Sequence, residues 1–167
     1  MHEVCFDGAL LKRGFWLYIW EVTTPKGEKL YYVGRTGDSS SINAQSPFNR
    51  MGQHLGTARN SSMLRNHLRN RRIPRLASRY RLVAYGPLFS QARSKDTHHQ
   101  RRDIVAGLEK ALADTLRDVG CTLLNEVKCR KPIHDSMFQK IKRGFAAEFP
   151  ELRHALAHCP RPRRQRR

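Results

Sequence analysis

A run of aromatic and β-branched residues over positions 15–23 constrains the fold of this chain most strongly. It reads Phe-Trp-Leu-Tyr-Ile-Trp-Glu-Val-Thr, and residues of this kind favour strands over helices. A second run of the same character covers residues 30–33. Between the two runs, Pro25 and Gly27 are placed to reverse the chain. The pattern therefore predicts a β-hairpin.

Periodic apolar residues predict the elements that follow the hairpin. Residues 34–47 are rich in Gly, Ser and Asn, which indicates a long loop. The spacing of apolar residues then predicts helices over 48–58, 61–73, 96–119 and 135–148, and a third strand over 78–85. Ser61-Ser62 would cap the second of these helices, and Gly120 would follow the end of the third. The order β-β-α-α-β-α-α predicts a small α/β (α+β) fold in which helices flank a three-stranded antiparallel sheet.

The charge of the chain indicates its type of partner. Lys and Arg number 32 and Asp and Glu number 14, which gives a formal net charge of +18. A compact fold with this charge favours a polyanion, and DNA or RNA is the first candidate. An anionic membrane is the rival, but the chain shows no long apolar run or lipidation signal. We therefore expect a cytoplasmic, nucleoid-associated protein that does not bind a membrane, and its oligomeric state stays open.

Metal-binding signatures are weak among the cysteines and paired histidines. Cys5, Cys121, Cys129 and Cys159 include no C-x-x-C pair, so we expect reduced thiols rather than a zinc knuckle. His98 and His99 are adjacent in the sequence, and adjacent side chains point apart on a helix. We therefore expect a solvated pair rather than two ligands of one ion.

Six residues spread along the chain form a more specific pattern. Two tyrosines lie in the hairpin strands, an arginine and a histidine follow at a spacing of four, and a glutamate and an asparagine come later. In order they are Tyr18 in Leu-Tyr-Ile, Tyr32 in Tyr-Val-Gly, Arg50 and His54 in Arg-Met-Gly-Gln-His, Glu109 in Gly-Leu-Glu-Lys-Ala-Leu, and Asn125 in Leu-Leu-Asn. This joint order resembles that of the GIY-YIG endonuclease superfamily, although Trp16 stands at the first glycine of the family's name.

The resemblance divides the chain into four parts. Residues 15–126 would form the GIY-YIG nuclease-like domain, preceded by an N-terminal extension over 1–14. A helical extension over 127–158 and a basic disordered tail over 159–167 would follow.

The resemblance implies a phosphodiester hydrolase that uses one divalent ion. Glu109 would hold Mg²⁺ or Mn²⁺, which are hard cations that carboxylate oxygen suits. Tyr18 would act as the general base or orient the attacking water, with Tyr32 as its partner. A free phenol has a pKa near ~10, so Tyr18 needs a cation nearby, and Arg35 or the metal would supply it. Strand alternation places Tyr18 opposite the more apolar face that carries Leu17.

The other pattern residues would bind the substrate. Arg50 would clamp the scissile phosphate, and His54 would assist proton transfer or hold the phosphate. Asn125 would position either the substrate or the sheet backbone. Gly34 would let the backbone turn tightly beside the phosphate, with Arg35 next to it.

A cluster of arginines without an acidic neighbour predicts a surface that follows the phosphate backbone of a nucleic acid. The cluster consists of Arg65, Arg69, Arg71, Arg72, Arg75, Arg79 and Arg81. We therefore expect a Mg²⁺-dependent DNA endonuclease. A catalytically inactive nucleic-acid-binding protein of the same fold, or an RNA-directed nuclease, is the alternative.

Overall fold

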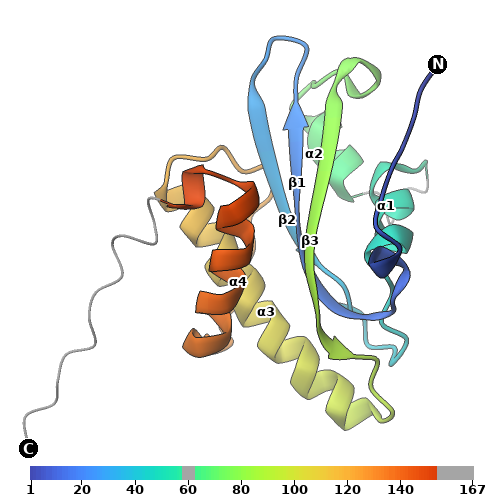
Figure 1. Ribbon diagram of the computed structural model, residues 1–167, viewed down its shortest axis with the longest axis vertical. Coiled ribbons are helices and arrows are strands. Elements are labelled where there is room, and N and C mark those ends of the chain that lie inside the picture. Colours follow the sequence, from blue (N-terminus) through green and yellow to red (C-terminus); the bar gives the residue numbers. More distant parts are fainter. Residues whose placement is uncertain (58–62, 154–167) are drawn as a thin grey trace, which may run out of the picture.

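The computed structural model describes residues 1–57 and 63–153 and confirms the predicted α+β class. Three strands form one antiparallel sheet in the order β2-β1-β3 (Figure 1). These are β1 (Gly14–Thr23), β2 (Lys29–Arg35) and β3 (Arg79–Ser90). The hairpin register pairs Trp20 with Tyr32 and Tyr18 with Gly34. The third strand runs past the predicted end at Tyr85 and through Gly86 and Pro87.

Helices cover both faces of the sheet (Figure 1). The long α3 (Lys95–Asp118) and α4 (Asp135–Glu148) pack against the face that carries Leu17 and Ile19. The short α1 (Pro47–Leu55) and α2 (Met63–Asn70) pack against the face that carries Tyr18 and Tyr32. The expectation that Tyr18 lies on a less buried face is therefore wrong, because its side chain is only 1% exposed. The alternation of side chains along the strand indicated on which face of the sheet Tyr18 lies, but it did not indicate that helices cover that face.

The end of α3 sets the position of the next segment against the sheet. Gly120 has a φ of +86°, and its N–H donates to the Arg117 carbonyl at 2.9 Å while the Cys121 N–H donates to the Leu116 carbonyl at 2.9 Å. This pair of bonds forms the left-handed helix cap that the glycine predicted. The chain then runs beside β2, where the Leu124 N–H donates to the Tyr31 carbonyl at 2.6 Å.

The segments outside residues 15–126 join the same structure. Phe138, Ile141 and Phe145 of α4 belong to the core that also holds Leu17 and Ile19. The short 3-10 helix η1 (Gly8–Leu11) precedes β1. The predicted Ser61-Ser62 cap, Cys159 and the tail over 159–167 lie outside the described residues. No helix within residues 1–57 and 63–153 has the length and apolarity needed to cross a bilayer.

Replacing Arg72 with glycine should stabilise the fold. Arg72 follows α2 with a φ of +56°, and the bonds there repeat the glycine cap of α3, with the Ile73 N–H donating to the Leu68 carbonyl at 2.9 Å. A non-glycine residue in this region costs about 1 kcal/mol. We expect Arg72→Gly to raise the free energy of unfolding in urea by about this amount. Arg69→Gly, inside α2, should lower it, and a loss of stability in Arg72→Gly would contradict the prediction.

Candidate active site

The two predicted tyrosines meet a histidine beneath α1. Tyr18 on β1 and Tyr32 on β2 lie on the same face of the sheet, and His54 in the last turn of α1 is fully buried against both. The centroid of the His54 ring lies 5.5 Å from that of Tyr18 and 5.1 Å from that of Tyr32. The fold thus brings together three of the predicted residues that are up to 36 positions apart in sequence.

The contacts of the Tyr18 hydroxyl favour one tautomer of His54. This hydroxyl lies 2.6 Å from His54 Nε2 and 3.3 Å from the Arg35 carbonyl. Both contacts are satisfied when Nε2–H donates to the Tyr18 oxygen and the Tyr18 O–H donates to Arg35. The buried Nδ1 of His54, which has no partner among the described residues, then carries a lone pair rather than a proton. In this state His54 donates to Tyr18 and would stabilise a Tyr18 phenolate.

Burial opposes ionisation of both tyrosines. It raises the pKa of Tyr18 and of Tyr32 well above the usual value for a phenol. The guanidinium of Arg50 lowers both pKa values in part. The cation that acts on Tyr18 in the protein alone is therefore Arg50 and not Arg35, whose guanidinium points toward Glu109. Both phenols are protonated at neutral pH in this state.

Arg50 is positioned for an anion beside the tyrosines. Its Nη2 donates to Asp38 Oδ2 at 3.0 Å and its Nη1 donates to Gln53 Oε1 at 3.2 Å. Its buried Nε has no partner among the described residues. A buried, unpaired guanidinium nitrogen is costly unless a ligand satisfies it. Arg50 therefore keeps one donor available next to Tyr18.

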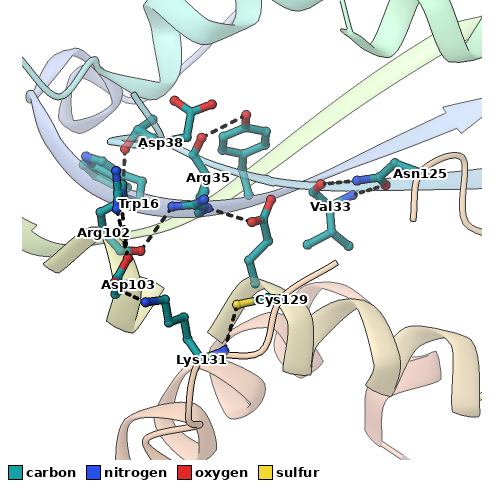
Figure 2. Close-up of polar contacts among 12 residues, drawn as sticks. Trp16, Val33, Arg35, Asp38, Arg102, Asp103, Asn125, Cys129 and Lys131 are labelled. Carbon is teal, nitrogen blue, oxygen red and sulfur yellow. Dashed lines mark hydrogen bonds and ion pairs between the residues drawn. The ribbon is translucent and has the colours of Figure 1, made fainter. Parts of the chain in front are cut away.

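Glu109 of α3 lies near the sheet, as expected, because it pairs with Arg35 of β2. Figure 2 labels Arg35 and marks its contacts with dashed lines. Arg35 Nε donates to Glu109 Oε2 at 2.7 Å, and Arg35 Nη1 donates to the Arg102 carbonyl at 3.1 Å. Burial raises the pKa of Glu109 to about 7, and Arg35 opposes this rise. We take the short ion pair to mean that Glu109 is ionised above neutral pH. Arg35 thus provides the counter-charge of a partly buried carboxylate.

The structure resolves the two roles left open for Asn125 in favour of the sheet backbone (Figure 2). Its Oδ1 accepts from the Val33 N–H at 3.1 Å and its Nδ2 donates to the Val33 carbonyl at 2.8 Å. Both polar atoms of the amide are used in this pair. Asn125 therefore holds β2, which carries Tyr32, in place.

The explanation of Gly34 as a tight turn is wrong. Gly34 lies inside β2 opposite Tyr18. A Cβ at this position would lie 2.6 Å from Cζ and from the hydroxyl oxygen of Tyr18. The glycine is needed because the Tyr18 ring occupies the space over the backbone.

The arginines of the predicted cluster divide into those that bond to other parts of the fold and those that are exposed. Arg65, Arg71 and Arg75 donate to the carbonyls of Thr57, Leu123 and Leu55, respectively, and Arg81 pairs with Glu148. These arginines join separate segments of the fold. The side chains of Arg69, Arg72 and Arg79 are exposed, and no ion pair involves them within the described part of the chain.

Three functional candidates were not found from the sequence. Asp38 pairs with Arg50, the ring of His67 lies 5.8 Å from that of Tyr32, and His98 is fully buried. The expectation of a solvated His98-His99 pair is wrong for His98, whose Nε2 lies 2.8 Å from the Ser39 carbonyl. Its ring packs 5.1 Å from that of Phe15. The helical pattern of α3 contained the signal, because His98, Val105 and Leu112 repeat at intervals of seven.

Glu109 is the partly buried carboxylate that would hold a divalent ion in this site. The described residues contain no group of three or more His, Cys, Asp and Glu side chains that could hold a metal. Glu109 interacts electrostatically with Arg50 and with both tyrosines. One carboxylate fits Mg²⁺, because this ion keeps several waters and takes its other ligands from substrate phosphate. The fit requires Arg35 to release at least part of Glu109.

Acid should destabilise the fold through His54. Burial lowers the pKa of His54 to about 3, from 6.5 in the unfolded chain. Between these values the unfolded chain binds a proton that the folded protein excludes. The contribution of neutral His54 to the free energy of unfolding is thus fully present above pH 6.5 and is lost toward pH 3. The loss is at most about 1.4 kcal/mol for each pH unit. Urea unfolding at several pH values should show a smaller acid loss in His54→Gln than in the wild type, and equal losses would contradict the assignment.

Comparisons with protein-family models, with curated proteins and with solved structures gave no match for this chain.

Proposed function

We propose that this protein is a metal-dependent endonuclease that hydrolyses phosphodiester bonds in DNA with GIY-YIG-type chemistry. The observation that supports this most is the convergence of Tyr18, Tyr32, His54, Arg50 and Glu109 from four separate elements around one buried position. A base, a phosphate clamp and a metal ligand are the groups that phosphodiester hydrolysis requires. The net charge of +18 supports a nucleic acid as the substrate.

Each residue has a role that its contacts allow. Tyr18 orients the attacking water through its hydroxyl, whose direction the His54 Nε2–H fixes; the water gives its proton to solvent as the new P–O bond forms and the leaving oxygen departs. Arg50 donates its free Nε to the scissile phosphate. Glu109 would hold Mg²⁺ or Mn²⁺, and the ion would supply charge neutralisation for the phosphate. Arg35 moves from the carboxylate to a phosphate oxygen as the substrate enters.

The test is nicking of a supercoiled plasmid with Mg²⁺ or Mn²⁺, followed on a gel. We expect nicking by the wild type, none after chelation of the metal, and a loss of about a thousandfold in Glu109→Gln. Glu148→Gln is the matched control, because it removes an exposed carboxylate on α4 and should cut at the wild-type rate. If the wild type binds DNA but cuts neither DNA nor RNA with any divalent ion, the chain is a nucleic-acid-binding protein and the enzyme proposal fails.

A further inference from the structure

Leu76 is an apolar side chain held in solvent by a well-anchored loop. It is 92% exposed and lies in the 3-10 helix η2 (Arg75–Ala77) between α2 and β3. Single exposed leucines are common on protein surfaces. Leu76 differs from them because the backbone around it is fixed and because several arginines lie within a few residues of it in the sequence.

Three side chains anchor this loop on both sides of Leu76. The Ser78 hydroxyl donates to the Pro74 carbonyl at 2.8 Å, and the Tyr80 hydroxyl donates to the Arg75 carbonyl at 2.9 Å. Arg75 Nη1 donates to the Leu55 carbonyl at 2.9 Å. Leu55 follows His54, so the loop is attached to the helix that carries Arg50 and His54. The position of Leu76 relative to the candidate active site is therefore set by hydrogen bonds.

The sequence around Leu76 is strongly cationic. Arg69, Arg72 and Arg79 are exposed near it along the chain, and no Asp or Glu occurs between Asp38 and Asp96. Arg72 also occupies a left-handed backbone position that glycine would favour. An exposed leucine is unfavourable in water, and arginines close to it in the sequence are unfavourable in a bilayer core or against a basic partner. This combination suits a polyanion that also offers apolar surface, and stacked base pairs inside duplex DNA offer this.

We propose that Leu76 is a wedge that enters the minor groove of duplex DNA and separates two stacked base pairs, while Arg72 and Arg79 bind flanking phosphates. The proposal depends on the DNA partner of the proposed function but not on cleavage. Burial of Leu76 against base faces offsets the cost of unstacking. Flexible pyrimidine–purine steps should be preferred because they unstack most easily.

The test uses the full chain in chelator, so that no cleavage occurs, and a duplex with 2-aminopurine at a TpA step. We expect the wild type to raise the 2-aminopurine fluorescence through unstacking and to bend a donor–acceptor-labelled duplex. Leu76→Ser should remove both signals and weaken binding about tenfold, the factor expected from losing one buried leucine. Leu76→Met should retain them. Because Leu76 is exposed, both variants should unfold at the wild-type temperature.

Matched controls separate the wedge from charge and from general apolar contact. Ile133→Ser changes another exposed aliphatic residue and should leave both signals unchanged. Arg72→Gln and Arg79→Gln should weaken binding on every duplex and reduce its salt dependence. Wild-type fluorescence and bending in Leu76→Ser would overturn the wedge. Equal effects on double-stranded RNA or on single strands would also overturn it, since these lack the narrow minor groove of duplex DNA.

The failures of the two proposals can be told apart. If the plasmid is nicked but Leu76→Ser behaves as the wild type in the fluorescence assay, the wedge is wrong and the nuclease remains. If no metal supports cleavage but the fluorescence signal depends on Leu76, the nuclease proposal is wrong and the wedge remains.

Discussion

Replacing Gly34 with alanine should destabilise this protein by about 3 kcal/mol, near the upper end for overpacking a core. The added methyl group would lie 2.6 Å from Cζ and from the hydroxyl oxygen of Tyr18. The ring cannot move away easily, because it is 1% exposed and its hydroxyl lies 2.6 Å from His54 Nε2. Either β2 separates from β1 or Tyr18 leaves the position from which it would hold the water. Both changes should also remove the proposed cleavage.

Urea unfolding of the Gly34→Ala variant measures this effect. Gly52→Ala is the control, because Gly52 lies inside α1 with no atom within 4 Å of the added methyl group. Alanine should stabilise a helix there by up to about 1 kcal/mol. If Gly34→Ala unfolds at the same urea concentration as the wild type, the Tyr18 ring has room that the structure does not show, and the steric account of Gly34 is wrong.

Replacing Arg50 with alanine should reduce the proposed cleavage by about a hundredfold to a thousandfold, the usual loss for one donor to a developing oxyanion. The stability of the fold should change little. The guanidinium donates to Asp38 and Gln53 through its Nη atoms and interacts with the Tyr18 hydroxyl, and its Nε has no hydrogen-bond acceptor among the described residues. Removing an unsatisfied donor offsets the loss of these two bonds. A large effect on rate with a small effect on stability is typical of a group held ready for a ligand.

Nicking rates and urea unfolding of Arg50→Ala test both parts of this prediction. Arg117→Ala is the matched control, because Arg117 forms an exposed ion pair with Asp114 and should contribute little to either quantity. Unchanged cleavage by Arg50→Ala would remove the phosphate clamp from the proposed mechanism. A large loss of stability without a loss of rate per folded molecule would make Arg50 a structural residue.

The sequence predicted the elements of the fold well because each one has a local cause. The strand run at residues 15–23 and the glycine after α3 depend on intrinsic preferences of a few neighbouring residues. The placement of Glu109 against the sheet also followed from the apolar stripe beside it. These features need no knowledge of distant segments.

The predictions from the sequence that are wrong concern contacts between segments that are distant along the chain. Tyr18 was expected on a less buried face, but α1 and α2 cover that face. His98 was expected in solvent, but the loop after β2 supplies the Ser39 carbonyl that it contacts. The reason for Gly34 lies in a side chain on the adjacent strand. Periodicity gives the direction of a side chain, and only the tertiary structure gives what lies in that direction.

The Asn125–Val33 pair has a consequence for association between molecules. An edge strand offers unpaired N–H and C=O groups to another chain, and β2 is an edge strand of this sheet. The amide of Asn125 occupies both polar groups of Val33, and the neighbouring Leu123 forms a bridge with Tyr31. At the opposite edge, β3 carries Arg79, Arg81 and Pro87, which discourage pairing by charge and by a missing donor. Both edges of this small sheet are thus protected against intermolecular strand addition, a defence against aggregation for a chain with a buried, aromatic hairpin.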